Sequence, residues 1–139
     1  MPQQKAFSTV LVVVLLAILT VSCGTSSNSN RVLQSMAVTP ASADANNSPN
    51  GLVQFTATGT FSKSPSPAPV TFTDPYSGSW LVDSTMATLV GTGNGTATFK
   101  CVGGASGTTK VTAVASANSG MGTKNSSIAV SGTAQLTCP

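Results

Sequence analysis

The chain of 139 residues contains no histidine and no glutamate, and its only acids are three aspartates. A Ser–His–Asp or Cys–His site needs an imidazole base, and zinc sites draw mainly on His, Cys and carboxylate ligands. A glycosidase would need two facing carboxylates, chosen here from Asp44, Asp74 and Asp83. Their contexts, such as Thr73-Asp74-Pro75, are more typical of turn capping. We therefore predict a protein that is not an enzyme and that holds no metal or cofactor.

Charged residues are scarce, at 6% of the chain. Without residues 1–22, five basic and three acidic side chains remain, and they are spread singly along the sequence. A nucleic-acid interface needs clustered Lys and Arg, and so does a polybasic membrane patch. We expect no nucleic-acid partner and a surface covered mainly by Thr, Ser, Asn and Gln.

One long apolar run is present, close to the N-terminus. Lys5 precedes the run Val10–Leu19, which ends in the small residues before Cys23. A positive start, about ten apolar residues and a small-residue end indicate an export signal, and the run is short for a membrane span. The sequence therefore predicts a protein that leaves the cytoplasm.

The segment Thr20-Val21-Ser22-Cys23-Gly24 resembles a bacterial lipobox, although Thr20 stands where Leu is usual. The resemblance implies cleavage after residue 22, acylation of Cys23 and a lipid-anchored protein of the cell envelope. Gly24, rather than Asp, implies the outer membrane if the organism is Gram-negative. Two or three acyl chains hold a protein stably on a bilayer. Cleavage by the general signal peptidase and an uncleaved anchor are the alternatives.

Three cysteines leave one unpaired in an exported protein. If Cys23 carries lipid, Cys101 and Cys138 can pair in an oxidising compartment. Cys101 shares a strand face with Phe99, and Cys138 shares one with Leu136, so both sulfurs are expected to point into the core. The bridge would close a loop of about 38 residues and stabilise the fold by about 4 kcal/mol. Two free buried thiols are the alternative.

The remaining chain divides into a short tether and one domain. Residues 24–30 contain no apolar side chain and indicate a flexible segment. We therefore assign 1–22 to the signal peptide, 23–31 to the lipidated N-terminus and tether, and 32–139 to a single domain.

The domain shows the period of two that is typical of β-strands. The clearest strand is 53–61, where apolar residues alternate with Gln and Thr. Another strand is expected to begin at Val70 and Phe72, Asn94-Gly95 is suited to a type I′ hairpin, and Gly132 marks a bulge or bend. About seven short strands without a helical period predict an antiparallel two-sheet sandwich, with a closed barrel as the alternative.

Three aromatic residues are the predicted anchors of the core. Phe55 and Phe99 lie on the apolar faces of their strands, and Trp80 shares a face with Val82. The alternative for Trp80 is a surface ring that contacts a ligand.

Four segments resemble the bacterial immunoglobulin-like domain, group 2. They are 36–40, 53–61, Trp80 with 87–89, and 110–113, so the likeness covers most of 33–130. A proline-rich loop before Trp80 and the run Trp80-Leu81-Val82 depart from the family pattern. The resemblance implies an immunoglobulin-like sandwich without catalytic residues, used as a spacer or binding module.

These observations predict a non-enzymatic envelope lipoprotein whose single domain is a surface binding or structural module for a protein or glycan. The alternatives are an accessory subunit of an envelope or secretion complex and a soluble secreted module.

Overall fold

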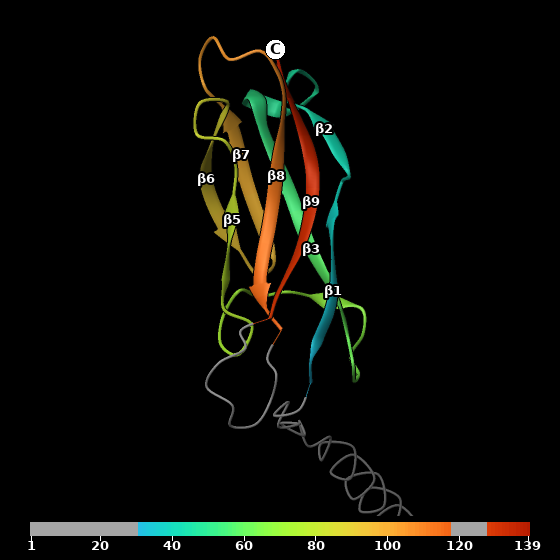
Figure 1. The fold of residues 1–139 in the computed structure, drawn as a ribbon. Coiled ribbons are helices and arrows are strands. Elements are labelled where there is room, and N and C mark those ends of the chain that lie inside the picture. The colour runs from blue at the N-terminus through green and yellow to red at the C-terminus, as the bar shows by residue number, and fades with distance from the viewer. Residues whose placement is uncertain (1–30, 118–127) are drawn as a thin grey trace, which may run out of the picture.

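The computed structural model describes residues 31–117 and 128–139, so Cys23 lies outside the described residues. The described part is built from strands and two 3-10 turns (Figure 1). The elements are β1 (Leu33–Thr39), β2 (Ser42–Asp44), η1 (Ala45–Asn47), η2 (Pro49–Gly51), β3 (Leu52–Phe61), β4 (Ala68–Pro69), β5 (Gly78–Leu81), β6 (Ala87–Gly93), β7 (Thr96–Cys101), β8 (Gly107–Ser116) and β9 (Ala129–Cys138).

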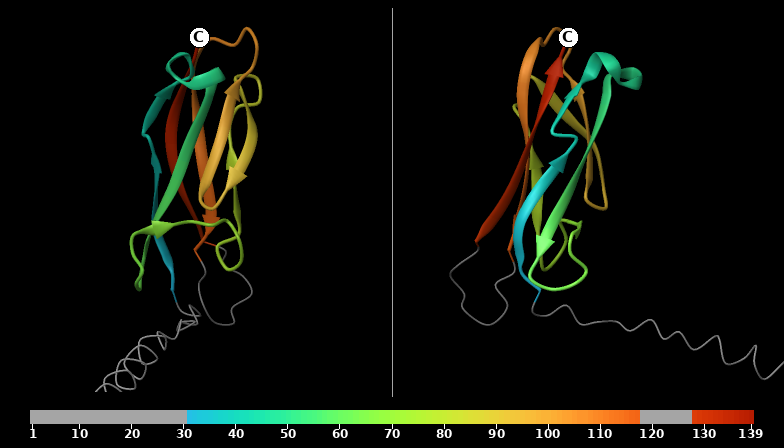
Figure 2. Two further views of the ribbon diagram at one scale, coloured as in Figure 1. Left: turned by 180° about the vertical axis from the view of Figure 1, so that it is seen from behind. Right: turned by 90° about the vertical axis from the view of Figure 1, so that its right-hand side faces the viewer.

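The strands form two sheets that pack as separate layers (Figures 1 and 2). One sheet has the order β1-β3-β7-β6, with β4 beside β3, and the other has the order β2-β9-β8-β5. These are the ABED and GFC orders of a constant-type immunoglobulin domain, with β2 added beside the last strand. The predicted immunoglobulin-like sandwich is therefore confirmed, and the barrel alternative is wrong.

The described residues hold nine strands rather than about seven, and not every pair is antiparallel. β1 and β2 are separate because the chain leaves the first sheet at Pro40 and joins the second, where β2 runs parallel to β9. β4 is a two-residue ladder on β3. These short additions lie at the sheet margins, where the period of two is too brief to recognise in the sequence.

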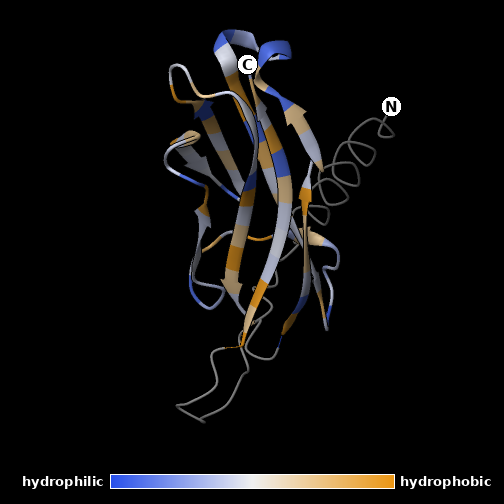
Figure 3. Cartoon of the chain, turned by 45° about the horizontal axis from the view of Figure 1, so that its top comes forward, coloured by the Kyte–Doolittle hydropathy of each residue, from blue (hydrophilic) through white to orange (hydrophobic). Residues whose placement is uncertain are grey.

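The core follows the alternation of the strands, which is visible as bands of hydropathy in Figure 3. Along β3, Val53 and Phe55 are buried, whereas Gln54 is exposed. The Phe99 ring packs against Phe55 and Trp80 at centroid distances of 6.0 and 6.1 Å. Trp80 is 7% exposed, so the three predicted core anchors are confirmed and Trp80 is not a surface ring.

The expectation of a strand beginning at Val70 and Phe72 is wrong. Val70 is fully buried, but Phe72 has φ +57° and cannot continue a strand in that conformation. The left-handed backbone turns the chain while the Phe72 ring packs 5.5 Å from that of Trp80. The turn then closes with a hydrogen bond from the Tyr76 amide to the Thr73 carbonyl, at 2.8 Å.

Two expectations about glycines also need correction. The β8–β9 ladder passes Gly132 without a bulge, and a Cβ there would lie 2.7 Å from the Met36 carbonyl oxygen. Gly132 therefore permits the close passage of β1. In the β6–β7 hairpin, Gly95 has φ +74° but Asn94 has no positive φ, so the turn is not type I′. The Gly95 carbonyl accepts a hydrogen bond from the Ala57 amide at 2.7 Å, which ties the turn to β3.

Candidate functional site

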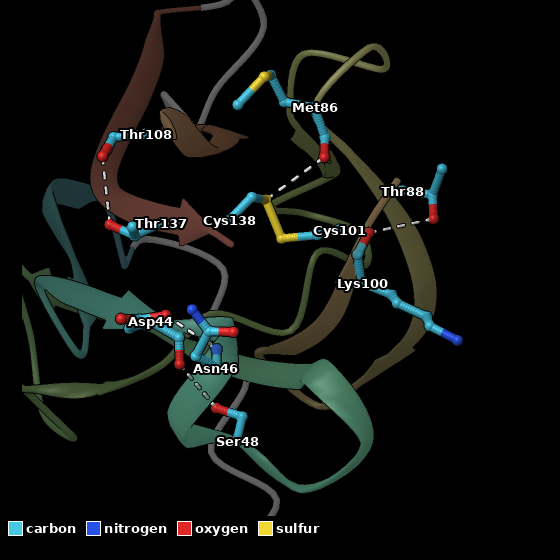
Figure 4. Close-up of a disulfide and its surroundings, with 10 residues drawn as sticks. All are labelled: Asp44, Asn46, Ser48, Met86, Thr88, Lys100, Cys101, Thr108, Thr137 and Cys138. Carbon is cyan, nitrogen blue, oxygen red and sulfur yellow. Dashed lines mark hydrogen bonds between the residues drawn. A yellow bond between two sulfur atoms is a disulfide. The ribbon is translucent and has the colours of Figure 1, made fainter. Parts of the chain in front are cut away.

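The Cys101–Cys138 disulfide joins the two sheets at one end of the sandwich. The residues end β7 and β9, with Cα atoms 5.8 Å apart (Figure 4). Cys138 is buried, and its Sγ lies 3.5 Å from the Met86 carbonyl oxygen. The predicted pairing is confirmed. It differs from the usual immunoglobulin bridge, which joins strands B and F and would correspond here to β3 and β8.

Beside the disulfide lies a surface depression of about 440 Å³. It is lined by the η1–η2 segment, by residues 100–105 around Cys101, and by Pro139. Among the described residues that line it, Lys100 is the only one with a charged side chain. This depression can receive a small polar or anionic group through hydrogen bonds, but the lining side chains that the structure describes include no acid–base pair.

The side chains that shape this end hold its turns. Asp44 Oδ1 accepts a hydrogen bond from the Asn46 amide at 2.9 Å and so caps η1 (Figure 4). Ser48 Oγ donates to the Asp44 carbonyl at 3.3 Å. The Asp44 carboxylate is therefore occupied with local structure, as the turn context of the aspartates predicted.

Asp83 caps another turn, between β5 and β6. Its Oδ1 accepts hydrogen bonds from the Thr85 amide at 2.9 Å and from the Thr85 hydroxyl at 2.7 Å. The amide bond first, and then the hydroxyl bond, lowers the pKa of Asp83. The group is fully exposed and stays ionised at neutral pH, so it is not suited to proton donation.

The opposite end of the sandwich is held by Arg31, which the tether assignment 23–31 included. Arg31 is 8% exposed and its guanidinium carbon lies 3.4 Å from the centroid of the Phe61 ring. Its Nε donates to the Lys63 carbonyl at 3.2 Å, and another guanidinium N–H donates to the Pro65 carbonyl. Arg31 is thus part of the domain.

Tyr76 completes this cluster around Arg31. Its hydroxyl donates a buried hydrogen bond of 2.7 Å to the Arg31 carbonyl, and its ring packs 5.2 Å from that of Phe61. Sequence reasoning missed both residues. Arg31 follows a polar run and resembles a linker residue, and the only available signal for Tyr76 was its place in a proline-containing turn.

Thus the structure brings Cys101 and Cys138 together at one end and gathers Phe55, Trp80 and Phe99 in the core. Residues 31–117 and 128–139 contain no group of three or more His, Cys, Asp or Glu that could hold a metal ion. In those same ranges, no helix is long and apolar enough to cross a membrane.

The chain matches no known protein-family model and no curated protein.

Proposed function

We propose that this protein is a non-enzymatic lipoprotein of the cell envelope, anchored through Cys23, whose immunoglobulin-like domain binds another protein. The lipobox-like residues support the anchor, and the four segments that resemble the bacterial group 2 immunoglobulin-like domain support the use of the fold as a binding or spacing module.

The position of the two ends of the domain carries this proposal. The chain enters the sandwich at Arg31, and the disulfide-bonded end lies at the other extremity of the strands (Figure 1). An anchor that precedes Arg31 would therefore leave the depression beside Cys101 on the side far from the attachment point. Arg31 and Tyr76 fix the direction in which the chain enters, because both are tied to the domain by buried contacts.

The distribution of aromatic residues favours a protein partner over a glycan. Of the six aromatic residues that the structure describes, five are buried and Phe72 is half-buried. Ligand sites are usually lined by apolar and aromatic side chains with a few polar groups. The outer face of the sheet β2-β9-β8-β5 instead presents mainly Thr, Ser and Gln, for example Thr112 and Thr133 on β8 and β9, together with the exposed Leu81. Such faces offer hydrogen bonds but no aromatic platform for a sugar ring.

The anchor is tested by intact mass spectrometry of the protein extracted from membranes, with a Cys23→Ala chain as the control. We expect a mass that begins at Cys23 and includes acyl chains. The Cys23→Ala protein should lack these chains and leave the membrane fraction. A mass without acyl groups for the unmodified chain would overturn the lipoprotein assignment and favour a secreted module.

The binding role is tested separately by crosslinking in cells and purification from detergent-solubilised membranes. Recurrent recovery of a defined protein is expected, and a constant stoichiometry with one envelope complex would identify an accessory subunit. Crosslinking exclusively to polysaccharide would contradict the protein-binding role.

A further inference from the structure

The sheet β2-β9-β8-β5 has an incomplete edge. β8 has ten residues, but β5 pairs with only four of them, Thr112–Ala115. Residues 107–111 pair with β9 on one side and with no strand of the described chain on the other. A cleft of about 470 Å³ lies at this vacancy, between Leu81–Asp83 and the β8 residues around Lys110.

Two hydrogen bonds establish which backbone groups face the vacancy. The Ser116 amide donates to Ser77 on the β5 side at 2.9 Å, and the Ala117 amide donates to Ile128 on the β9 side at 2.8 Å. Successive residues of an antiparallel strand point their N–H and C=O groups to opposite sides. The β8–β9 register is uninterrupted, so the even-numbered residues point away from β9. The N–H and C=O groups of Thr108 and Lys110 therefore face the cleft.

The vacancy exists because Asp83 turns the chain away. Leu81 is the last partner on β5, and the same register would place residue 83 opposite Lys110. Instead, the Asp83 carboxylate binds the Thr85 amide and hydroxyl, and its carbonyl accepts the amides of Met86 and Ala87 at 3.1 and 3.0 Å. This turn carries the chain to β6 in the other sheet, and the place beside Thr108 and Lys110 stays unfilled.

We propose that this vacancy accepts an extended segment of the protein partner as an added strand, with an acidic side chain beside Lys110. Strand addition uses main-chain hydrogen bonds for affinity and alternate side chains for specificity. Thr108 and Lys110 supply two donors and two acceptors in the geometry of the sheet. The added strand continues the line of β5 beyond Leu81.

Charge and exposure select this occupant. Lys110 is exposed, and no carboxylate of the described chain forms an ion pair with it. The Asp83 carboxylate also lines the cleft, but it is turned toward the Thr85 amide and hydroxyl and forms no ion pair with Lys110. Leu81 is 53% exposed and lies opposite Thr112, on the same face as Lys110. A segment with an acid opposite Lys110 matches this charge, while Leu81 itself fills the position opposite Thr112.

A second copy of the chain fits this edge less well. Pairing two copies around the same vacancy would bring two Lys110 ammonium groups together, and an edge lysine is a recognised obstacle to such pairing. The same lysine attracts an acidic segment. The charge therefore distinguishes between partners rather than closing the edge to all of them.

The inference rests on the proposed role as a binding module and names the partner's chemistry. The vacancy lies in the half of β8 near Gly107, which pairs with Cys138, so it is at the disulfide-bonded end and far from Arg31. Its test does not depend on acylation. A failed anchor test and a failed strand-addition test can therefore be told apart.

The geometry is tested first by amide hydrogen exchange. NMR on the full chain in detergent micelles measures the exchange rate of each amide. The amides of Thr108 and Lys110 should exchange at least tenfold faster than those of Thr109 and Val111, which face β9. The probe is the capped peptide Thr-Glu-Thr-Glu-Thr, which spans residues 107–111 and whose symmetric pattern suits either strand direction. Saturating peptide should slow exchange at Thr108 and Lys110 at least tenfold.

Matched controls separate strand addition from general adhesion. The same peptide N-methylated at its three central residues should bind at least tenfold more weakly, because the methyl groups remove donors and obstruct the ladder. Lys110→Glu should lose affinity for the glutamate peptide severalfold and gain it for the peptide with Lys in place of Glu. Lys110→Pro should fold and lose binding at least tenfold, whereas Thr109→Pro should lower the Tm because its N–H belongs to the β9 ladder.

Three results would overturn the proposal. The first is slow exchange at Thr108 and Lys110 in the free protein, which would mean that its own chain fills the vacancy. The second is equal binding of the N-methylated peptide, or no binding of either peptide. The third is protection that depends on protein concentration without peptide, which would identify a second copy as the occupant.

Discussion

The two ends of the sandwich are held together by different chemistry. At one end, the Cys101–Cys138 disulfide joins the last residues of β7 and β9 covalently. At the other, Arg31 stacks on Phe61 and is tied to carbonyls of the proline-rich loop, and Tyr76 hydrogen-bonds to its backbone. The disulfide also restricts the unfolded chain, whereas the Arg31 cluster acts only in the folded state.

This difference bears on function as well as on stability. The Arg31 cluster fixes the segment through which the chain enters the domain. The disulfide-bonded end instead carries the depression beside Lys100 and the vacant edge of β8. The Cys101–Cys138 disulfide lies near this incomplete sheet edge. It can hold the edge in place while the backbone N–H and C=O groups of β8 stay unpaired. Under the proposed function, the Arg31 end would orient the domain and the disulfide-bonded end would offer contacts.

The largest effect is expected at the disulfide. Replacing both Cys101 and Cys138 with Ser should lower the free energy of unfolding by about 4 kcal/mol, because the bridge closes a long loop in the unfolded chain. Urea unfolding measures this, and reduction of the unmodified protein should give a similar midpoint. A loss below about 1 kcal/mol would show that the two ends contribute far more equally than the chain-entropy argument predicts.

The second-largest effect is expected for Arg31→Ala, which should lower the free energy of unfolding by about 2–3 kcal/mol. The substitution removes the cation–π contact with Phe61 and leaves the carbonyls of Lys63 and Pro65 without their guanidinium donors. Arg31→Lys is the matched control: it keeps the charge but loses the planar fork, and an intermediate stability is expected. A change within about 0.5 kcal/mol for Arg31→Ala, the range of ordinary surface substitutions, would contradict the role of this cluster.

Tyr76→Phe should cost about 1 kcal/mol, because it removes one buried hydrogen bond and keeps the packing of the ring on Phe61. Thermal unfolding by circular dichroism measures the change. The double variant with Arg31→Ala should be less destabilised than the sum of the single variants, since the residues share one cluster. Strict additivity would argue that the hydroxyl and the guanidinium act independently.

The smallest effect is expected from Asp83, at the turn that ends β5. Its pKa is lowered in the folded state, so its stabilising contribution is present above the ordinary carboxyl pKa and is lost as the pH falls below about 4. Asp83→Asn should therefore reduce stability at pH 7 more than at pH 3, as measured by urea unfolding at both values. If Asp83→Asn lowered the free energy of unfolding equally at both pH values, the stability of this turn would not depend on the ionisation of the carboxylate.

Individual residues show how far the sequence could predict these features. The alternation at 53–61 correctly placed Phe55 in the core, and the shared faces of Cys101 with Phe99 and of Cys138 with Leu136 correctly favoured the disulfide. Phe72 and Gly132 were misread, because their conformations depend on contacts with residues of other strands, Trp80 on β5 and Met36 on β1. Arg31 was assigned to the tether because its aromatic partner is 30 positions away in the chain.

For the two candidate sites, too, the sequence shows the residues but not their surroundings. Lys100 and Lys110 are visible in the sequence, but nothing local to them indicates a depression beside a disulfide or a strand without a neighbour. β5 and β8 are separated by the whole of β6 and β7. Their unequal pairing emerges only when the two sheets form, because Asp83 sends the chain to the other layer.

The sequence by itself determined the longer strands, the faces that they bury, which two cysteines are able to pair and the scarcity of acid–base groups. Side-chain alternation and residue chemistry are local properties, and each can be read without knowing the fold. The tertiary structure alone decided which strands are neighbours, where Arg31 stacks and why half of β8 lacks a partner. Those features depend on which backbone and side-chain groups meet across long separations, and a period of two records the face of a residue but not the strand beside it.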